Sequence, residues 1–415
     1  MRLVQLPSLV LLLAVGVTGC SRAPLGVPPP PPWTDDMQAV ADGQNKFALD
    51  LYAKLRDQEK ENLFFSPYSA HTALAMTATG AKGTTRAEMV KVLHLPADEQ
   101  KAAASGDLGQ FYAHPRMDFE LAVANSLWGQ KGFPWRAEFL ELQKTRFGAV
   151  FNEADFATNP DGERQRINHW VEEKTRDRIK DLLPNGSITS QHRMVLANAI
   201  YFKGQWQEKF DPKDTRSQPF TLADGTQAPV PMMHREGGFK LYSESKPEGR
   251  WRPEFQVAEL PYKGGELSMV ILLPGKHDGL PALEAKVSVE ALSTWLAKAQ
   301  DARDADLSLP KFRLETAAMM LNEPLQKLGM KAAFDAAAAD FTGLHTGAEQ
   351  LFVSFVVQKA FVDVNEEGTE AAAATAVGVK QTAAKLGFVA DHPFLFLIRD
   401  TKHGTILFMG RVLKP

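Results

Sequence analysis

Residues able to perform covalent chemistry occur in this sequence, but none of them stands in a common catalytic pattern. The ten histidines are scattered, and the two nearest, His392 and His403, are separated by eleven positions. The sequence contains no G-x-S-x-G nucleophile elbow, P-loop, H-E-x-x-H zinc motif or paired C-x-x-C motif. We therefore expect neither an enzyme nor a bound metal or cofactor. A hydrolase whose site assembles only in three dimensions is the alternative.

The single cysteine, Cys20, cannot form a disulfide within the chain. It follows Arg2, an apolar run over residues 9–17 and the small residues Thr18 and Gly19. Nine residues are too few to span a bilayer as a helix, which needs about 20, whereas this order of segments is typical of an export signal. The segment resembles a bacterial lipobox, so we expect residues 1–19 to be a lipoprotein signal peptide and Cys20 to carry lipid. A short buried helix with a core cysteine is the alternative.

Residues 20–36 include the unbroken run Pro28–Pro32. Five prolines favour an extended polyproline II rod, at roughly 3.1 Å per residue, so we expect a semi-rigid spacer between the lipid and a folded domain. A recognition motif for a proline-binding module is the alternative. The expected location is the bacterial cell envelope, facing the periplasm or the surface, with the membrane as a partner through Cys20.

Composition and charge describe an ordinary globular protein. Of 415 residues, 44% are hydrophobic and 23% are charged, and 47 Lys and Arg against 50 Asp and Glu give a net charge of -3. This balance provides no general attraction for phosphate backbones, so nucleic acid is not expected as a partner. No repeat or second linker interrupts residues 37–415, which we expect to form one monomeric domain.

The most informative stretch is 366–377, which reads EEGTEAAAATAV. Its alanines favour a helix capped by Thr369. In a strand, alternate side chains would instead share a face; one face would carry Thr369, Ala371, Ala373, Thr375, Val377 and Val379, and the other Glu370, Gly378 and Lys380. One face could then be buried and the other wet. Such small side chains would allow the segment to slide between existing strands without overpacking the layer beneath.

The elements expected around this stretch are helices early in the chain and strands late. Ser66-Pro67 is typical of a helix start, and Thr85 with Glu88 forms a capping-box pattern. Helical spacing continues from Ile167 to Leu183, and residues 351–364 are predicted to be a strand. The run 195–202 is apolar except for Asn198, as expected of a strand covered on both sides, so Asn198 needs hydrogen-bond partners.

Four separated blocks of the sequence together resemble the serpin family. The first two are NLFFSPYS at 62–69 and NAIYFKGQW at 198–206. The third is EEGTEAA at 366–372, which matches the family's hinge, and the fourth is FVADHPFLF at 388–396, which is followed by FMGRV at 408–412. These motifs occur in the family's order and cover residues 37–415.

The resemblance implies a mixed α+β fold with about nine helices, three β-sheets and an exposed reactive loop. It also implies a suicide inhibitor of serine proteases, with papain-like cysteine proteases as a further target class. The protease would cut the loop, and the loop would then enter the main sheet as a new strand. Insertion of a serpin loop is a known case of β-strand addition. The alternative is a non-inhibitory binding or chaperone protein of the same fold.

Family spacing assigns roles to individual residues. The implied reactive bond is Thr382–Ala383, and Lys380 offers a competing trypsin-like cut. Thr382 is small and uncharged, which suits elastase-like or subtilisin-like proteases. The implied hinge residues are Glu366, Gly368, Thr369, Glu370, Ala371, Ala372, Ala373 and Ala374.

The resemblance also implies a polar cluster under the opening strands, called the shutter, and a point where insertion begins, called the breach. Ser66, Ser69 and Asn198 match the shutter, and Trp206 matches the breach. Gln358 stands where the family often has histidine; an amide both donates and accepts hydrogen bonds but does not titrate. Ordinary capping and core packing are the alternative roles for these residues.

Overall fold

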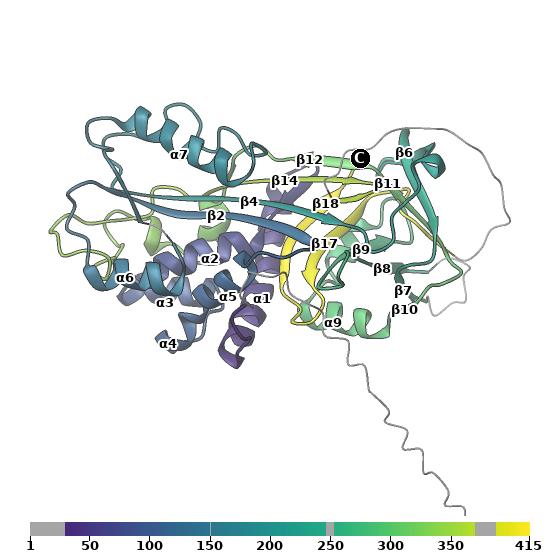
Figure 1. Cartoon of the computed structure of the whole chain (residues 1–415), viewed down its shortest axis with the longest axis horizontal. Coiled ribbons are helices and arrows are strands. Elements are labelled where there is room, and N and C mark those ends of the chain that lie inside the picture. Colours follow the sequence, from purple (N-terminus) through teal and green to yellow (C-terminus); the bar gives the residue numbers. More distant parts are fainter. Residues whose placement is uncertain (1–29, 150, 246–252, 370–386) are drawn as a thin grey trace, which may run out of the picture. The chain divides into compact units, whose positions relative to one another are not determined.

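The structure is a computed structural model that describes residues 30–149, 151–245, 253–369 and 387–415 (Figure 1). Residues 31–415 belong to one compact unit. The described residues contain three sheets and ten α-helices, the shortest of four residues, where about nine helices were expected. The helices are α1 Asp35–Gln58, α2 Pro67–Ala78, α3 Gly83–Val92, α4 Glu99–Ala102, α5 Ala104–Ala113, α6 Ala137–Arg146, α7 Pro160–Lys174, α8 Leu280–Glu284, α9 Val289–Lys298 and α10 Asn322–Leu328, with short 3-10 helices at Pro212–Asp214 and Ala332–Phe334.

One seven-stranded sheet, here called the long sheet, has the order β12-β14-β15-β4-β2-β3, with β13 paired to β14. Its strands are β2 Phe119–Gln130, β3 Phe151–Ala154, β4 Met194–Gln205, β12 Phe312–Glu315, β13 Met319–Met320, β14 Val357–Asn365 and β15 Gly368–Thr369. Every residue of 195–202 is buried in β4, so the expectation of a strand covered on both sides is confirmed.

Apart from β1, the other two sheets are built from strands that follow residue 215. The inner sheet, in the order β1-β18-β17-β9-β8-β7-β10, contains β1 Leu63–Phe65, β7 Lys240–Glu244, β8 Phe255–Pro261, β9 Leu267–Pro274, β10 Gln300–Asp301, β17 Phe394–Asp400 and β18 Ile406–Val412. The small sheet, in the order β16-β11-β6-β5, contains β5 Arg216–Thr221, β6 Gln227–Glu236, β11 Asp306–Pro310 and β16 Phe388–Val389. The mixed α+β expectation is confirmed.

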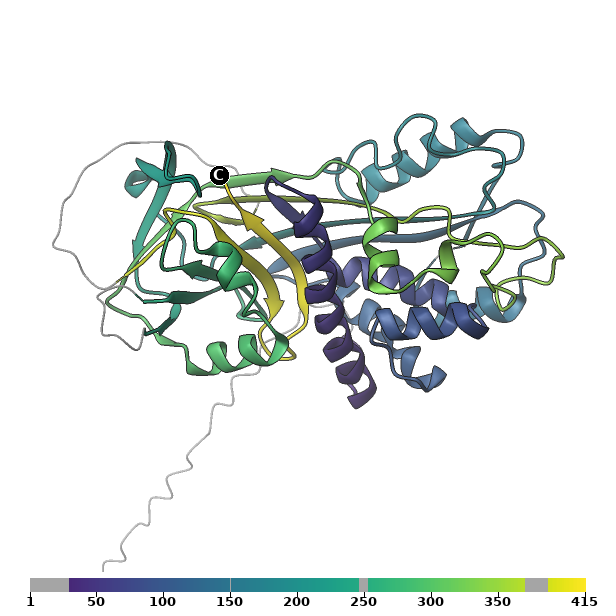
Figure 2. The same cartoon turned by 180° about the vertical axis from the view of Figure 1, so that it is seen from behind.

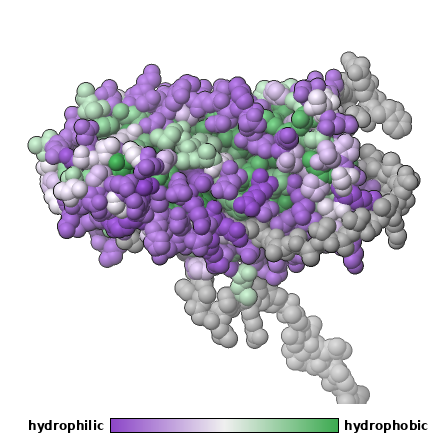
Figure 3. All heavy atoms as spheres, turned by 90° about the horizontal axis from the view of Figure 1, so that it is seen from above, coloured by the Kyte–Doolittle hydropathy of each residue, from purple (hydrophilic) through white to green (hydrophobic). Residues whose placement is uncertain are grey.

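Helices cover the two sides of the long sheet unequally. Figures 1 and 2 show α7 on one side of β2 and β4, and α2, α3 and α5 on the other. Residues of β4 with odd numbers, such as Ala197 and Tyr201, pack with Ile179 and Leu183 beside α7, whereas Ile200 and Phe202 pack against the inner sheet. Figure 3 views the molecule from above and shows hydrophobic residues in a band between hydrophilic margins. Both sides of β4 are therefore enclosed by packed apolar residues.

Of the two helix starts predicted from capping residues, one is confirmed and one is wrong. The Ser66 side chain accepts a hydrogen bond from the Ser69 amide and Pro67 opens α2, so this predicted helix start is confirmed. The predicted capping box is wrong, because α3 begins at Gly83 and its first residues make no side-chain cap. Thr85 instead accepts from the Asp340 amide, and Glu88 accepts from the amides of residues 331 and 332.

Two element boundaries also differ from the sequence expectation. The helix expected to continue to Leu183 ends at Lys174, and the Thr175 hydroxyl then accepts from the Ile179 amide. Ile179 and Leu183 are still fully buried, so the apolar spacing there reflects packing onto the sheet rather than a helix. The strand expected from residue 351 begins only at Val357. Among the described residues, no helix has the length and apolar character needed to cross a membrane.

Candidate functional site

The seam between β4 and β14 is the feature of the long sheet that bears on function. The two strands are parallel and pair directly from Ala197 with Val357 to Tyr201 with Phe361. Beyond this point β15 lies between them and pairs antiparallel with both. The two strands are therefore paired directly along one part of the seam. At the end of the seam, two residues of β15 separate them.

Glycine is required at position 368 by both conformation and space. Gly368 has φ of 151°, and a Cβ on it would lie 2.1 Å from the carbonyl oxygen of Gly204 on β4. Thr369 follows, is fully buried, and its hydroxyl lies 2.7 Å from the Tyr262 hydroxyl. Thr369 thus faces the interior as part of a strand, which opposes the alternative in which it caps a helix.

The turn that leads into β15 is held by an ion pair between a buried carboxylate and a partly exposed lysine. Glu366 is 2% exposed, and Lys311 Nζ lies 2.8 Å from its Oε2. Thr215 Oγ1 donates to Glu366 Oε1 at 2.8 Å. Burial alone would raise the pKa of the Glu366 carboxyl, but the hydrogen bonds from Lys311 and Thr215 outweigh it, so this pKa lies below its ordinary value of 4.5. The carboxylate is charged at neutral pH and ties the turn to residue 311.

Trp206 completes the anchorage of the same turn. Its indole Nε1 donates to the Asn365 carbonyl at 2.9 Å, and its backbone amide donates to the Glu367 carbonyl at 2.9 Å. The indole ring stacks on Tyr262 with centroids 4.8 Å apart. The residue expected at the breach therefore contacts the turn before β15 directly.

The four residues expected at the shutter are brought together beneath the closed part of the seam. Gln358 Nε2 donates to Asn198 Oδ1 at 2.7 Å, which links β14 to β4. Gln358 also exchanges hydrogen bonds with the backbone of Ser66, both at 2.9 Å. Asn198 Nδ2 donates to the hydroxyl of Ser69 and to its carbonyl oxygen. These buried amides have the partners that their burial requires.

Three functional candidates were missed from the sequence. Asn125 on β2 accepts from Asn198 and Ser69. Its signal was available, because alternation from Phe119 through residues 121 and 123 places Asn125 on the same apolar face. Lys311 and Tyr262 carried no such signal, since their partners lie 55 and 107 positions away.

Several predicted site residues lie outside the described part of the chain. They are Cys20, Glu370, Ala371, Ala372, Ala373, Ala374, Lys380, Thr382 and Ala383. Their roles stay predictions.

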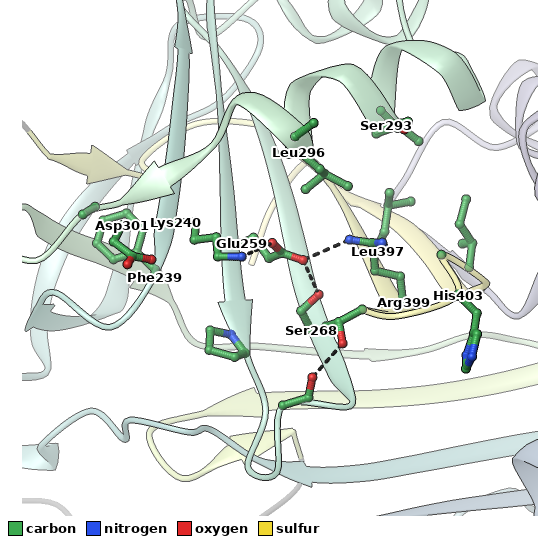
Figure 4. Close-up of a pocket in the computed structure, with 18 of the residues that line it drawn as sticks. Phe239, Lys240, Glu259, Ser268, Ser293, Leu296, Asp301, Leu397, Arg399 and His403 are labelled. Carbon is green, nitrogen blue, oxygen red and sulfur yellow. Dashed lines mark hydrogen bonds and ion pairs between the residues drawn. The ribbon is translucent and has the colours of Figure 1, made fainter.

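A separate cavity of about 840 Å³ lies between α1, α9 and the inner sheet (Figure 4). Its floor carries Glu259, whose Oε1 accepts from Arg399 at 3.0 Å and from the Ser268 hydroxyl at 2.8 Å, with the Lys240 ammonium 3.9 Å from Oε2. Apolar side chains line the wall, among them those of Leu296 and residues 292 and 397. The cavity thus combines an apolar wall with two cations around one buried carboxylate.

We expect substitution Lys311→Met to destabilise the protein by about 1.5–3 kcal/mol at pH 7, the usual worth of a hydrogen bond to a charged group. Because the pKa of Glu366 is depressed in the folded protein, its contribution is complete above about pH 5 and is lost as the pH falls below 4.5. The difference between wild type and variant in guanidinium unfolding should therefore shrink toward pH 3. Lys209→Met is the control, because Lys209 pairs with the more exposed Glu367. Equal effects of both substitutions would contradict the anchoring role.

Comparison with known proteins agrees with this geometry. The profile of the family described as "Serpin (serine protease inhibitor)" matches residues 42–415. Serpin B3 of Homo sapiens is 38% identical over 400 residues, and leukocyte elastase inhibitor A of Rattus norvegicus is 38% identical over 390; each match covers 91% of this chain and 100% of the relative. The structure of human thyroxine-binding globulin with thyroxine is 29% identical, covers 92% of this chain and 99% of that one, and superposes with a TM-score of 0.80. The chain belongs to the serpin family.

Proposed function

We propose that this protein traps serine proteases by inserting its cleaved reactive loop between β4 and β14. The supporting observation is the position of β15, which already lies between these two strands at the open end of the seam. The relatives named above include an elastase inhibitor, and serpins as a family are described as protease inhibitors. Covalent chemistry would come from the protease, which forms an ester with the loop, and this chain would supply the strand.

The register of β15 defines where each further residue would go. Thr369 lies opposite Gly204 on β4 and Val364 on β14. Six residues later, Thr375 would lie opposite Asn198 and Gln358. Insertion past this point must therefore separate the Asn198–Gln358 hydrogen bond, and the threonine hydroxyl would arrive where both amides lose a partner. The proposed strand thus supplies a hydroxyl group in place of the hydrogen bond that its insertion breaks.

The free energy for insertion would come from exchanging one β-ladder for two. The closed seam is a single parallel ladder; an inserted strand would form antiparallel ladders with both neighbours, and antiparallel pairing is slightly more stable. Ordering a residue costs about 1–2 kcal/mol, so the gain per residue from two ladders and side-chain burial must exceed this cost.

Small residues suit both faces of the proposed strand. Ala371 and Ala373 would face the interior, as Thr369 does. Ala374 and Ala376 would face the other side, where Ala197 already packs with Ile179, Leu182 and Leu183. The sequence predicted one solvent-exposed face for this strand. Because described residues cover both sides of β4, both faces of the proposed strand would be buried along this part of the seam.

We expect incubation with elastase or subtilisin to give a complex that survives SDS, together with a released C-terminal peptide that begins at Ala383. Thr375→Arg should reduce the yield of complex at least tenfold, because a charged side chain would have to be buried beside Asn198. The matched control is Gly378→Ala, which adds one small side chain. On the gel, Thr375→Arg should still be cleaved but should form no complex. If the protease cleaves the wild-type chain as a simple substrate without forming a complex, the proposal is refuted.

A second candidate function, ligand binding by a non-inhibitory serpin fold, is favoured by the cavity over the inner sheet. Lys240 and Arg399 contact the Glu259 carboxylate beneath an apolar wall, and further charged groups of both signs line the cavity, namely Asp42, Glu208, Asp301 and Arg303. An apolar wall with a few polar groups suits an amphipathic ligand. One structural relative is a thyroxine-binding protein.

The probe 1-anilinonaphthalene-8-sulfonate, an amphipathic anion, tests this second function. We expect saturable fluorescence enhancement that Leu296→Trp, which fills the cavity, weakens at least tenfold. Thr375→Arg serves as the control, since it leaves the cavity unchanged. Equal binding by wild type and Leu296→Trp would exclude the cavity as the site, whatever the result of the protease experiment.

We further propose that Cys20 carries lipid and that the part of the expected spacer 20–36 that precedes the folded unit tethers the domain to the envelope. The support is the order of a charged start, an apolar run and small residues before the cysteine. In a bacterial host, wild type should fractionate with membranes and incorporate labelled palmitate, whereas Cys20→Ala should do neither. Membrane association that is unchanged in Cys20→Ala contradicts the anchor.

A further inference from the structure

A groove of about 510 Å³ lies between the end of α1 and the β12 edge of the long sheet. One wall is the unbroken run 313–320, which comprises most of β12, the connection that follows it and β13. The other wall comes from the end of α1, the next turn and β1, namely Gln58, Glu59, Glu61, Asn62 and Phe64. The groove shares no lining residue with the cavity over the inner sheet. It therefore follows one stretch of chain along the edge of the sheet.

The strand that forms this wall has a free edge. β12 is the last strand of the long sheet, and it pairs antiparallel with β14 on one side. The Thr316 amide donates to the Ala360 carbonyl on β14. Because backbone groups alternate in direction along an antiparallel ladder, those of Arg313 and Glu315 point away from β14, toward the edge of the sheet. β1 is likewise the last strand of the inner sheet, so the edges of two sheets border the groove.

A free edge can pair with another chain, and short length and charged side chains are the usual means of preventing indiscriminate pairing. β12 has both features, since it contains four residues and exposes Arg313 and Glu315. Pairing at this edge therefore requires a partner whose charges suit the groove.

The charge of the groove lining is mainly negative. Glu59, Glu61 and Glu315 line it, and the only cation among the described lining residues is Arg313, which lies 3.6 Å from the Glu315 carboxylate. Glu59 and Glu61 are exposed and form no ion pair with any described residue. Lys60, between them in the sequence, donates to a backbone carbonyl of α1. Two carboxylates are thus available to cations of a partner.

Apolar groups also line the groove. Met320 is 49% exposed, which makes it one of the few large apolar side chains on the described surface, and Phe64 and Leu314 are buried in the walls. Methionine is flexible and polarizable, so it adapts to varied partner side chains. The groove therefore combines a free strand edge, available carboxylates and an apolar contact.

We propose that this groove binds an extended basic peptide segment of a partner protein. The segment would pair with the free edge of β12 and place lysine or arginine side chains beside Glu59 and Glu61. In such strand addition the main chain provides affinity, and alternate side chains provide specificity. Since alternate side chains of an extended peptide point to opposite sides, a segment that alternates basic and aliphatic residues fits best. Binding does not require β4 and β14 to separate, so the site is independent of the proposed protease trap.

Fluorescence anisotropy of the labelled peptide acetyl-KLKLKLK-amide tests the charge requirement at neutral pH. We expect saturable binding that weakens as salt is added, and no binding of the peptide with glutamate in place of lysine. Glu59→Lys combined with Glu61→Lys should weaken binding about tenfold, because it replaces two exposed attractions by repulsions. Glu99→Lys combined with Glu173→Lys is the matched control, since it changes the net charge equally at exposed positions on α4 and α7. No saturable binding at millimolar peptide, or equal losses in both double variants, overturns the proposal.

Two N-methylated versions of the basic peptide test strand pairing. One is methylated at the backbone nitrogens of its lysines and the other at those of its leucines, so charge and side chains are kept while the donors on one side of the extended chain are removed. We expect their affinities to differ about tenfold, the worth of two or three hydrogen bonds. Equal affinities overturn strand pairing.

Hydrogen exchange locates the bound peptide. We expect the peptide to slow exchange in residues 312–320 and 58–64. Protection of residues 195–202 instead would place the peptide in the seam between β4 and β14, and would overturn the groove as the site without contradicting the protease trap.

Discussion

The structure depends on a seam between two parallel strands that pair along only part of their length. Where β4 and β14 are in contact, their ladder is closed by five residue pairs and by the Asn198–Gln358 hydrogen bond. Where they separate, the unpaired edges would leave buried backbone groups without partners, a costly arrangement. Gly368 and Thr369 satisfy those groups. The sheet is thus stable as found, yet it contains a site whose geometry already matches an additional antiparallel strand.

Polar residues control this seam from two directions. At the open end, the buried Glu366 carboxylate is compensated by Lys311 and Thr215, which hold the incoming turn in place. Beneath the closed part, Asn198 and Gln358 form a hydrogen bond. Apolar side chains at these positions could pack there but could not form such a directional bond. If the loop inserts as proposed, these buried amides must be satisfied in both the closed and the inserted arrangement. That requirement would favour two discrete states of the seam over a continuous opening.

Features outside the seam are organised independently of it. The cavity floor around Glu259 belongs to the inner sheet, and the rings that pack against Trp33 belong to α5 and the turn after β17. Neither requires β4 and β14 to separate. The proposed protease trapping and the proposed ligand binding would therefore use separate parts of the fold, and a change at one of them need not alter the other.

The sequence alone determined those features whose physical cause is local. Proline after Ser66 starts a helix by fixing a dihedral angle, a continuous apolar run made β4 a covered strand, and the glycine and small residues of the hinge were recognisable without coordinates. Tertiary structure decided the partners. Thr85 and Glu88 hold an ideal local capping pattern, but amides near residues 331 and 340 bind them instead. The helix before Leu183 ends at Lys174 because the next residues leave helical geometry: Arg176 and Asp177 have positive φ, and the Ile179 amide donates to the Thr175 hydroxyl. Lys311 meets Glu366 only after the chain folds, since long-range pairing leaves no periodic signal in the sequence.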